Sequence, residues 1–137
     1  MKQRVIVDTG PLVALLNRRD RAHPWVVQQL REIVPPMITC EAVLAEATYL
    51  TRGLDGARAA LVEMVGESFL TIGMHLADHH SAILAMIRRY SDVPMSLADG
   101  CLVRLAELHP QSQVFTLDSD FSVYRKNGRK VIDVLTP

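Results

Sequence analysis

The chain has 137 residues, 49% of them hydrophobic, which suits one domain with a sizeable core and is too short for two ordinary domains. Its 15 Lys and Arg residues balance 15 Asp and Glu residues, so any nucleic acid must be bound by local clusters. No apolar run approaches the ~18 residues of a membrane-spanning helix, and Asp8 interrupts the chain before a secretory segment can form. We therefore expect a soluble, cytoplasmic protein without membrane association.

Short runs rich in Val, Ile, Phe or Thr predict five strands. These strands cover residues 3–7, 37–39, 69–72, 113–117 and 131–134. Helical patterns lie between them at 11–18, 24–33, 40–52, 55–65, 76–90 and 97–108, with a short helical turn at 119–124. Strands that alternate with helices need crossover connections. We therefore predict an α/β domain with a central, mostly parallel five-stranded sheet and helices on both faces.

The cysteines and clustered histidines do not form the usual patterns of a metal site. Cys40 and Cys101 lie in apolar stretches without CxxC spacing, so we expect buried free thiols. His75, His79 and His80 lie near one another on a predicted helix, but no third type of ligand accompanies them. We expect these histidines to be exposed or to cap the helix.

The first strand ends at an acid. Asp8 follows a β-branched run and precedes Thr9-Gly10-Pro11, where Pro11 fits the first turn of a helix. Ligands of open parallel sheets bind just outside the carboxyl ends of the strands, so Asp8 is a candidate site residue. Aspartate is also favoured in turns for its local hydrogen bonds, and this stretch alone does not distinguish the two roles.

A second acid lies inside a helix. Residues 39–52 predict a helix that is apolar nearly all round, with Thr39 as its N-cap. Glu46 lies in the middle of this helix, where a partly buried carboxylate is costly unless it is paired with a cation. The cation would be either an arginine from elsewhere in the chain or a metal ion.

Two further acids lie near predicted helix starts. Asp99 follows Ser96 by three residues, which is the spacing of a capping box, and capping is compatible with ligand binding at a helix N-terminus. Asp118 and Asp120 follow the strand that ends in Thr116-Leu117. Asp118 would cap the short helix, and the helix dipole favours Asp120 in its first turn.

The topology predicts that Asp8, Glu46, Asp99 and Asp118 converge on the carboxyl edge of the sheet. Four carboxylates at one place repel one another unless a hard divalent cation lies among them. Ligands that are all oxygen favour Mg²⁺ or Mn²⁺ over zinc.

Four segments resemble the PIN-domain ribonucleases, and within them the toxin subunits of the virulence-associated, VapC-like, toxin-antitoxin type. The segments are VIVDTGPLVALL, ITCEAVLAEATYL, MSLADGCLVRLAE and VFTLDSDFSVYR. The resemblance covers essentially the whole chain and places the four acids of the family at Asp8, Glu46, Asp99 and Asp118. It implies a Mg²⁺-dependent endoribonuclease, with Mn²⁺ as a second candidate metal, in which Asp8, Asp99 and Asp118 bind metal and Glu46 completes the catalytic set.

The resemblance also implies supporting residues. These are Thr9, Thr116 and Asp120. Many members of the family carry Asn or Ser at the position of Gly10. A hydrogen bond that orients the metal-binding carboxylate of Asp8 would then be missing in this chain or supplied by Thr9.

The basic segment YRKNGRK at 124–130 provides Arg125 and Lys126 as candidate RNA-binding residues. The resemblance implies a homodimer and a cognate antitoxin protein as partner. Trp25 and Leu61 are candidate residues of an antitoxin-binding groove, and core packing explains each of them equally well.

Two other functions compete with RNA cleavage. A non-catalytic PIN-like module would bind RNA or protein without a need for mutually repelling acids. An aspartyl-phosphate phosphotransferase would need a second Asp where Gly10 stands, and a catalytic lysine for which the chain offers no good candidate.

Overall fold

The computed structural model describes residues 3–137 and contains a central sheet of five strands. The strand order is β3-β2-β1-β4-β7. The strands are β1 (Arg4–Val7), β2 (Met37–Thr39), β3 (Leu70–Ile72), β4 (Ser112–Phe115) and β7 (Val134–Leu135). Every neighbouring pair in this sheet is parallel. The predicted α/β architecture is confirmed, with a sheet that is parallel throughout.

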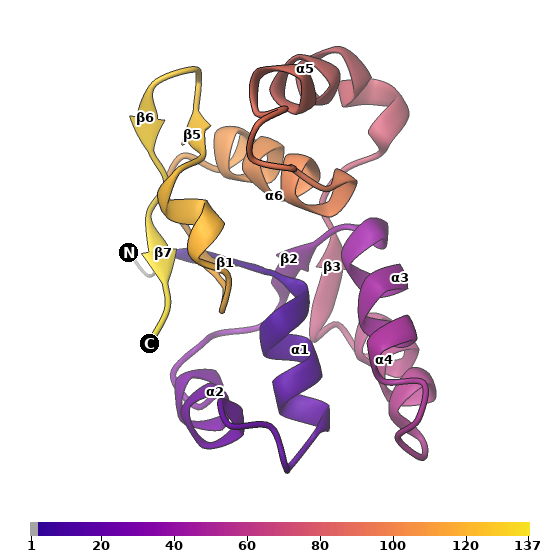
Figure 1. The fold of residues 1–137 in the computed structure, drawn as a ribbon. Helices are drawn as coiled ribbons and strands as arrows, with labels where there is room; N and C mark the ends of the chain where they lie inside the picture. Colours follow the sequence, from indigo (N-terminus) through magenta and orange to yellow (C-terminus); the bar gives the residue numbers. More distant parts are fainter. Residues whose placement is uncertain (1–2) are drawn as a thin grey trace.

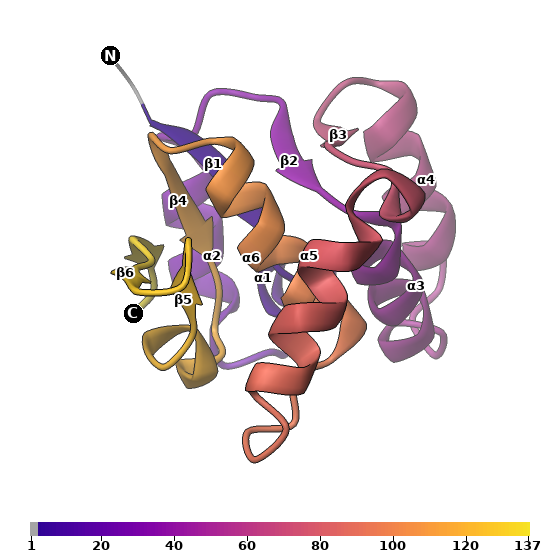
Figure 2. The same ribbon diagram turned by 90° about the horizontal axis from the view of Figure 1, so that it is seen from above.

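Helices cover both faces of the sheet (Figure 1). They are α1 (Thr9–Leu16), α2 (His23–Leu30), α3 (Glu41–Leu50), α4 (Ala57–Gly66), α5 (Leu76–Arg89) and α6 (Leu97–Leu108), with a 3-10 turn, η1, at Ser119–Ser122. α6 packs against β1, β2 and β4, and α5 packs on α6. Seen from above, α6 lies across the sheet with α5 alongside it (Figure 2). α1 and α2 lie on the other face.

The core is formed by the inner strands and the helices that cover them. Ile6, Val7 and Phe115 are fully buried, as expected for strands that have neighbours on both sides and helices on both faces. Trp25 packs edge-on against Phe115 with ring centroids 5.6 Å apart, and Leu61 is fully buried. Core packing therefore accounts for Trp25 and Leu61. Within residues 3–137, no helix combines the length and the apolar character needed to cross a membrane.

The first four helices begin at residues 9, 23, 41 and 57, one or two residues from the predicted starts at 11, 24, 40 and 55. Two of these differences have a clear local cause. α1 begins at Thr9 because the Asp8 carboxylate accepts a hydrogen bond from the Thr9 amide and caps the helix. Thr39 is not the cap of α3: it belongs to β2, and its hydroxyl donates to the Val7 carbonyl at 2.9 Å. Cys40 takes the cap position without a side-chain hydrogen bond. Both cysteines are free and buried, as predicted.

The predicted last strand, 131–134, is also wrong. Lys130–Val131 forms β6, which pairs antiparallel with β5 (Arg125–Lys126), and the strand that joins the sheet is Val134–Leu135. The cause is a turn at Asn127 and Gly128, which both have positive φ, at 52° and 80°. Asn-Gly strongly favours such hairpin turns, so the sequence held a signal for this reversal.

A tight contact between the sheet and α6 provides a test of the packing. A Cβ on Gly73 would lie 2.5 Å from Ile38 Cγ2 and 2.7 Å from Leu105 Cδ2. Gly73→Ala should therefore destabilise the fold by roughly 1 to 3 kcal/mol in urea unfolding. Gly66→Ala is the matched control, because nothing lies within 4 Å of its Cβ position. Equal stability of the two variants would contradict this packing.

Candidate active site

A hollow of about 470 Å³ opens at the carboxyl edge of the sheet, where β1 leads into α1 (Figure 1). Its lining, among the residues that the structure describes, contains acids and no lysine, arginine or histidine. The acids are Asp8, Asp20, Glu46, Asp99 and Asp118. The structure thus brings the four predicted acids to one place and adds Asp20, which sequence reasoning missed.

Asp8 is the most buried of these acids, with 6% of its surface exposed. Its Oδ1 accepts a hydrogen bond from the Thr9 amide and its Oδ2 one from the Thr116 hydroxyl, both at 2.7 Å. Burial raises the pKa of Asp8 from 3.8 to about 6, and the charges of Asp99 and Asp118 add to the rise. The two hydrogen bonds act in the opposite direction. Asp8 is therefore a buried carboxylate with negative neighbours.

Thr116 links two of the acids. Its hydroxyl donates to Asp8 and accepts a hydrogen bond from the Asp118 amide at 2.9 Å. The exposed Asp118 accepts a hydrogen bond from the Asp120 amide at 2.9 Å and so caps η1. Asp120 lies in the first turn of η1 and is not among the residues that line the hollow. Its backbone amide, rather than its carboxylate, supports Asp118.

Asp99 lies in the first turn of α6 and is held from two sides. Its amide donates to Ser96 Oγ at 3.0 Å, as the capping spacing predicts. Its Oδ2 accepts a hydrogen bond from the hydroxyl of the buried Tyr124 at 2.9 Å. Burial raises the pKa of Asp99, whereas the bond from Tyr124 lowers it. Ser96 thus caps α6 by accepting from the Asp99 amide, and the Asp99 carboxylate lines the hollow.

Tyr124 is the second residue that sequence reasoning missed. It is separated from Asp99 by 25 positions, and no local pattern connects them. The rings of Tyr90 and Phe121 pack edge-on against Tyr124, at 5.2 Å and 5.3 Å between centroids. Burial and the hydrogen bond to Asp99 raise the pKa of Tyr124, so its hydroxyl stays a donor at neutral pH.

Glu46 reaches the hollow from α3, but the expectation that it is partly buried is wrong. Its side chain is exposed, because this face of α3 turns toward the open hollow rather than the core. The ion pair found in residues 3–137 joins Arg104 to Glu107 at 3.1 Å, and Glu46 takes no part in it. An arginine partner therefore does not explain Glu46.

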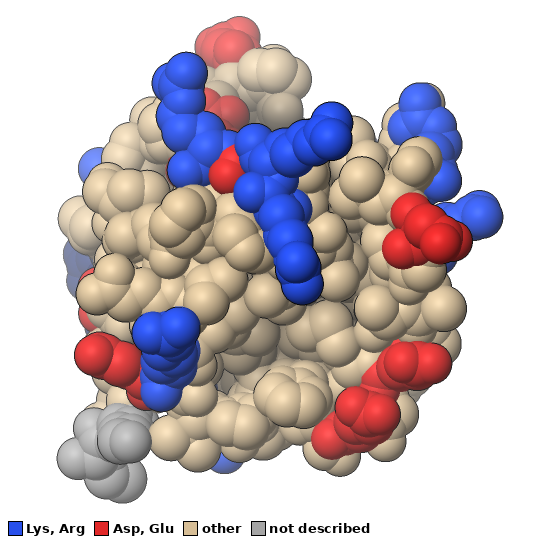
Figure 3. All heavy atoms as spheres, turned by 90° about the horizontal axis from the view of Figure 1, so that it is seen from below, with Lys and Arg blue, Asp and Glu red and all other residues tan. Residues whose placement is uncertain are grey.

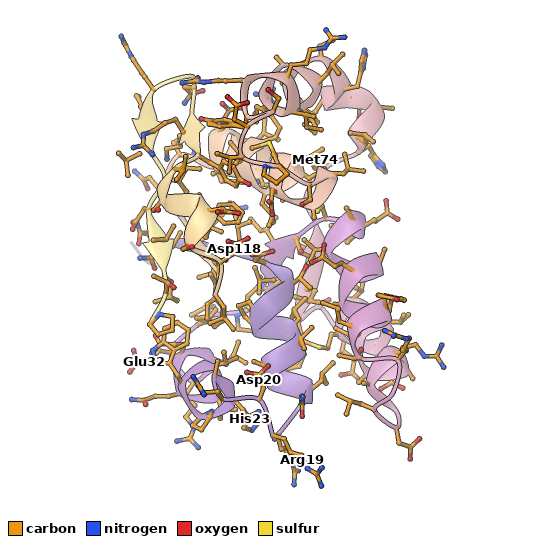
Figure 4. All side chains as sticks on the ribbon, in the orientation of Figure 1. Arg19, Asp20, His23, Glu32, Met74 and Asp118 are labelled. Carbon is orange, nitrogen blue, oxygen red and sulfur yellow. The ribbon has the colours of Figure 1, made fainter. Side chains whose placement is uncertain are left out.

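Asp20 forms the far end of the hollow from Asp118, and both are labelled in Figure 4. It lies in the loop between α1 and α2, where its Oδ1 accepts a hydrogen bond from the Ala22 amide at 2.9 Å. Val13 of α1 lines the hollow between these ends. The hollow therefore extends from the edge of the sheet along α1 to this loop.

Thr9 and Gly10 also line the hollow. The Thr9 hydroxyl is buried and has no hydrogen-bond partner among residues 3–137. A Cβ on Gly10 would lie 3.2 Å from Cβ of Leu117, so Leu117 fills the space beside Gly10. The hydrogen bonds that orient Asp8 come instead from the Thr9 amide and the Thr116 hydroxyl.

The donor set fits a hard divalent cation. Several carboxylates line one hollow without a basic side chain in its described lining, and oxygen ligands of this kind suit Mg²⁺ or Mn²⁺. As they stand, no three His, Cys, Asp or Glu side chains of residues 3–137 are close enough to hold one ion together.

The structure does not bring the predicted RNA-binding residues into the hollow. The Arg125 guanidinium donates to the carbonyls of Ser122, Val123 and Tyr124. The Lys126 ammonium lies 3.4 Å from the Pro110 carbonyl, beyond the end of α6 that is opposite to Asp99. The RNA contacts of Arg125 and Lys126 stay a prediction.

The clustered histidines also lie outside the hollow. His79 accepts a hydrogen bond from the Arg104 guanidinium at 3.1 Å, and His80 contacts the Ala77 carbonyl.

Comparison with known proteins shows similarity over most of the chain. A family model described as "PIN domain" matches residues 5–127. Ribonuclease VapC26 of Mycobacterium tuberculosis is 28% identical over 128 residues, which are 90% of this chain and 94% of that protein. The crystal structure of Mycobacterium tuberculosis VapC20, described as a Sarcin-Ricin loop cleaving toxin, matches with a TM-score of 0.78. It is 21% identical and covers 87% of this chain and 93% of its own, which supports the fold.

Asp8 makes the stability of the metal-free protein depend on pH. Since its pKa is about 6 in the fold and near 3.8 when unfolded, its contribution is fully present below pH 3.8 and is lost as pH rises through 6. Lowering the pH from 7.5 to 5 should therefore add roughly 1 to 1.5 kcal/mol to the stability from this group. Asp8→Asn should lack this gain in the free energy of unfolding when measured in urea. Asp133→Asn should keep the gain, because Asp133 lies at the amino end of β7, away from the acids. An unchanged pH response in Asp8→Asn would contradict the raised pKa.

The hydrogen bond from Tyr124 should hold down the pKa of Asp99. Tyr124→Phe removes that donor, so the pKa of Asp99 should rise in an NMR titration of the metal-free protein. The lost bond should also cost about 1 kcal/mol of stability. Tyr90→Phe is the control, because the Tyr90 hydroxyl accepts a hydrogen bond from the Arg125 amide, whereas the hydroxyl that donates to Asp99 belongs to Tyr124. If both variants leave the Asp99 titration unchanged, Tyr124 does not tune the site.

Proposed function

The chain belongs to the PIN domain family, and from this premise we propose that it is a Mg²⁺-dependent endoribonuclease, the toxin of a toxin-antitoxin pair. The observation that carries the proposal is the hollow lined by five acids without a lysine, arginine or histidine. A scaffold that only binds RNA has no use for such a concentration of negative charge, because RNA phosphates are repelled by it. A site that binds divalent cations, in contrast, needs several negatively charged oxygen ligands.

In this proposal Asp8, Asp99 and Asp118 hold the metal, and Glu46 completes the catalytic set from the facing helix. Mg²⁺, or Mn²⁺ in its place, supplies an activated water and neutralises charge that develops on the phosphoryl oxygens.

The chain's own groups orient these acids. The Thr116 hydroxyl holds Asp8 and the Asp118 loop together, and the Tyr124 hydroxyl holds Asp99. Thr9 has a supporting role through its amide, which donates a hydrogen bond to Asp8. The carboxylate of Asp120 is assigned a weaker supporting role, at the start of η1.

The competing functions fit the hollow less well. A phosphotransferase of the aspartyl-phosphate type needs a second acid two residues after the first, but Gly10 occupies that position and packs against Leu117. It also needs a lysine, and none is present in the described lining. A non-catalytic binding module is distinguished by the cleavage experiment below.

The proposal includes a cognate antitoxin as partner, a homodimer and a location in the cytoplasm. An apolar hollow of about 470 Å³ between α1, α2 and α4 is a candidate surface for the antitoxin, and its lining includes Leu16, Leu30, Ile33, Met64 and Phe69. Figure 3 shows this end of the molecule, with an uncharged hollow bordered by charged groups. Trp25 and Leu61, the residues expected from the sequence, are not among its lining.

The decisive experiment incubates the purified protein with total cellular RNA and with a short labelled RNA, in the presence of Mg²⁺ or of a chelator. We expect cleavage with Mg²⁺, loss of cleavage on chelation and recovery when the metal is restored. Asp99→Asn should lower the rate by more than the ten- to hundredfold that loss of a single supporting hydrogen bond costs. Asp133→Asn is the matched control, since its side chain binds Gln3 and Gln113 away from the hollow.

Two results would contradict this function. Cleavage that persists in chelator, or that is lost equally in Asp133→Asn, would exclude a metal site built on these acids. RNA binding without any cleavage would favour the non-catalytic module.

A further inference from the structure

Three exposed arginines lie within four positions of one another on the loop between α1 and α2. They are Arg18, Arg19 and Arg21. Among residues 3–137 none of their side chains takes part in a salt bridge or side-chain hydrogen bond. Figure 3 shows a group of basic side chains over this end of the molecule, and Figure 4 shows Arg19 pointing away from the end of α1. Their guanidinium groups are therefore free to bind a ligand.

The loop that carries these arginines is held in a fixed shape. Asn17 Oδ1 accepts a hydrogen bond from the Arg19 amide at 3.1 Å, and Asp20 Oδ1 accepts one from the Ala22 amide at 2.9 Å. The His23 ring contacts the Ala14 carbonyl at 2.6 Å and ties the start of α2 to α1. The backbone of the loop therefore has little freedom left to lose when the arginines bind a ligand.

The same loop is a wall of the acidic hollow. Asp20, which lies between Arg19 and Arg21, lines the hollow together with Val13 of α1 and Asp8 at the other end of that helix. α1 has eight residues, so about 12 Å of helix separates the acid cluster from the loop. A single RNA strand whose cleaved phosphate lies at the acids reaches the arginines within a few nucleotides.

The hollow is negative and the loop beside it is positive, so only the loop can attract the phosphates of such a strand. The hollow itself is negative and attracts metal ions, but it does not attract the phosphates of a polynucleotide. Since the chain has no net charge, the attraction must come from a local basic group beside the hollow. Arginine suits this task because its planar guanidinium binds phosphate oxygens in pairs.

We propose that Arg18, Arg19 and Arg21 form the RNA docking surface of this protein and bind the phosphates next to the one that is cleaved. The proposal rests on the ribonuclease function proposed above and names where the substrate strand lies. It assigns to the loop after α1 a role that the sequence suggested for Arg125 and Lys126.

The test measures the affinity for a labelled single-stranded RNA by fluorescence anisotropy over a range of salt concentrations, with Ca²⁺ in place of Mg²⁺. For wild type, the logarithm of the affinity should fall linearly with the logarithm of the salt concentration. The variant Arg18→Gln/Arg19→Gln should bind more weakly, with a slope reduced by about 0.7 for each lost phosphate contact. Arg21→Gln, measured separately, should show the loss of one contact.

Two variants of equal charge change serve as controls. Arg31→Gln/Arg129→Gln removes two exposed arginines, one at the C-cap of α2 and one on the hairpin between β5 and β6, and it should leave the slope unchanged. Arg125→Gln/Lys126→Gln tests the surface predicted from the sequence, and its effect on the slope should be smaller than that of the loop pair, because Arg125 and Lys126 already contact backbone carbonyls. Melting temperatures establish that each variant is folded.

The outcomes separate this inference from the ribonuclease proposal. If wild type cleaves RNA but the loop variants keep the wild-type salt slope, the docking surface is wrong and the function stands. If wild type binds RNA through the loop without cleaving it, the docking surface stands and the function fails. A larger loss in either control pair than in the loop variants would overturn the docking surface.

Discussion

The Thr116 hydroxyl is the group on which the geometry of the acidic edge depends. It donates to the buried carboxylate after β1 and accepts from the amide of Asp118 after β4, so it fixes the ends of two adjacent strands relative to each other. The pairing of β1 with β4, in register from Arg4 with Ser112 to Val7 with Phe115, brings Thr116 to this place. The pairing of these two strands therefore sets the positions of Asp8 and Asp118 through the side chain of Thr116.

The acidic site lowers the stability of the fold. Burial of Asp8 raises its pKa to about 6, and neighbouring acids add to the cost of its charge. The surrounding structure offsets part of that cost with hydrogen bonds to Asp8 from the Thr9 amide and the Thr116 hydroxyl, and Tyr124 donates in the same way to Asp99. Sites of this kind, in which stability is given up where ligands bind, are common in enzymes.

Much of this arrangement could be predicted from the sequence because its signals are local. Val5-Ile6-Val7 followed by Asp8, and Ser96 followed by Asp99, each place an acid at the end of a strand or the start of a helix. Other features depend on distant contacts. Tyr124 reaches Asp99 only because the chain after η1 packs against α6, and Asp20 reaches the hollow only through the path of the loop after α1. The exposure of Glu46 follows from which face of α3 the neighbouring helices leave open, and the pattern of residues along α3 does not contain that information.

The bond between Thr116 and Asp8 joins residues 108 positions apart. A ribosome that synthesises this protein makes three of the four predicted acids well before it makes Thr116, β4 or the strand that completes the sheet. Until those segments are made, β1 lacks one of its two neighbouring strands, and Asp8 lacks the hydroxyl that orients it. The acidic edge of the sheet therefore reaches its final geometry only after β4 and Thr116 have been synthesised, although Asp8 is among the first residues of the chain.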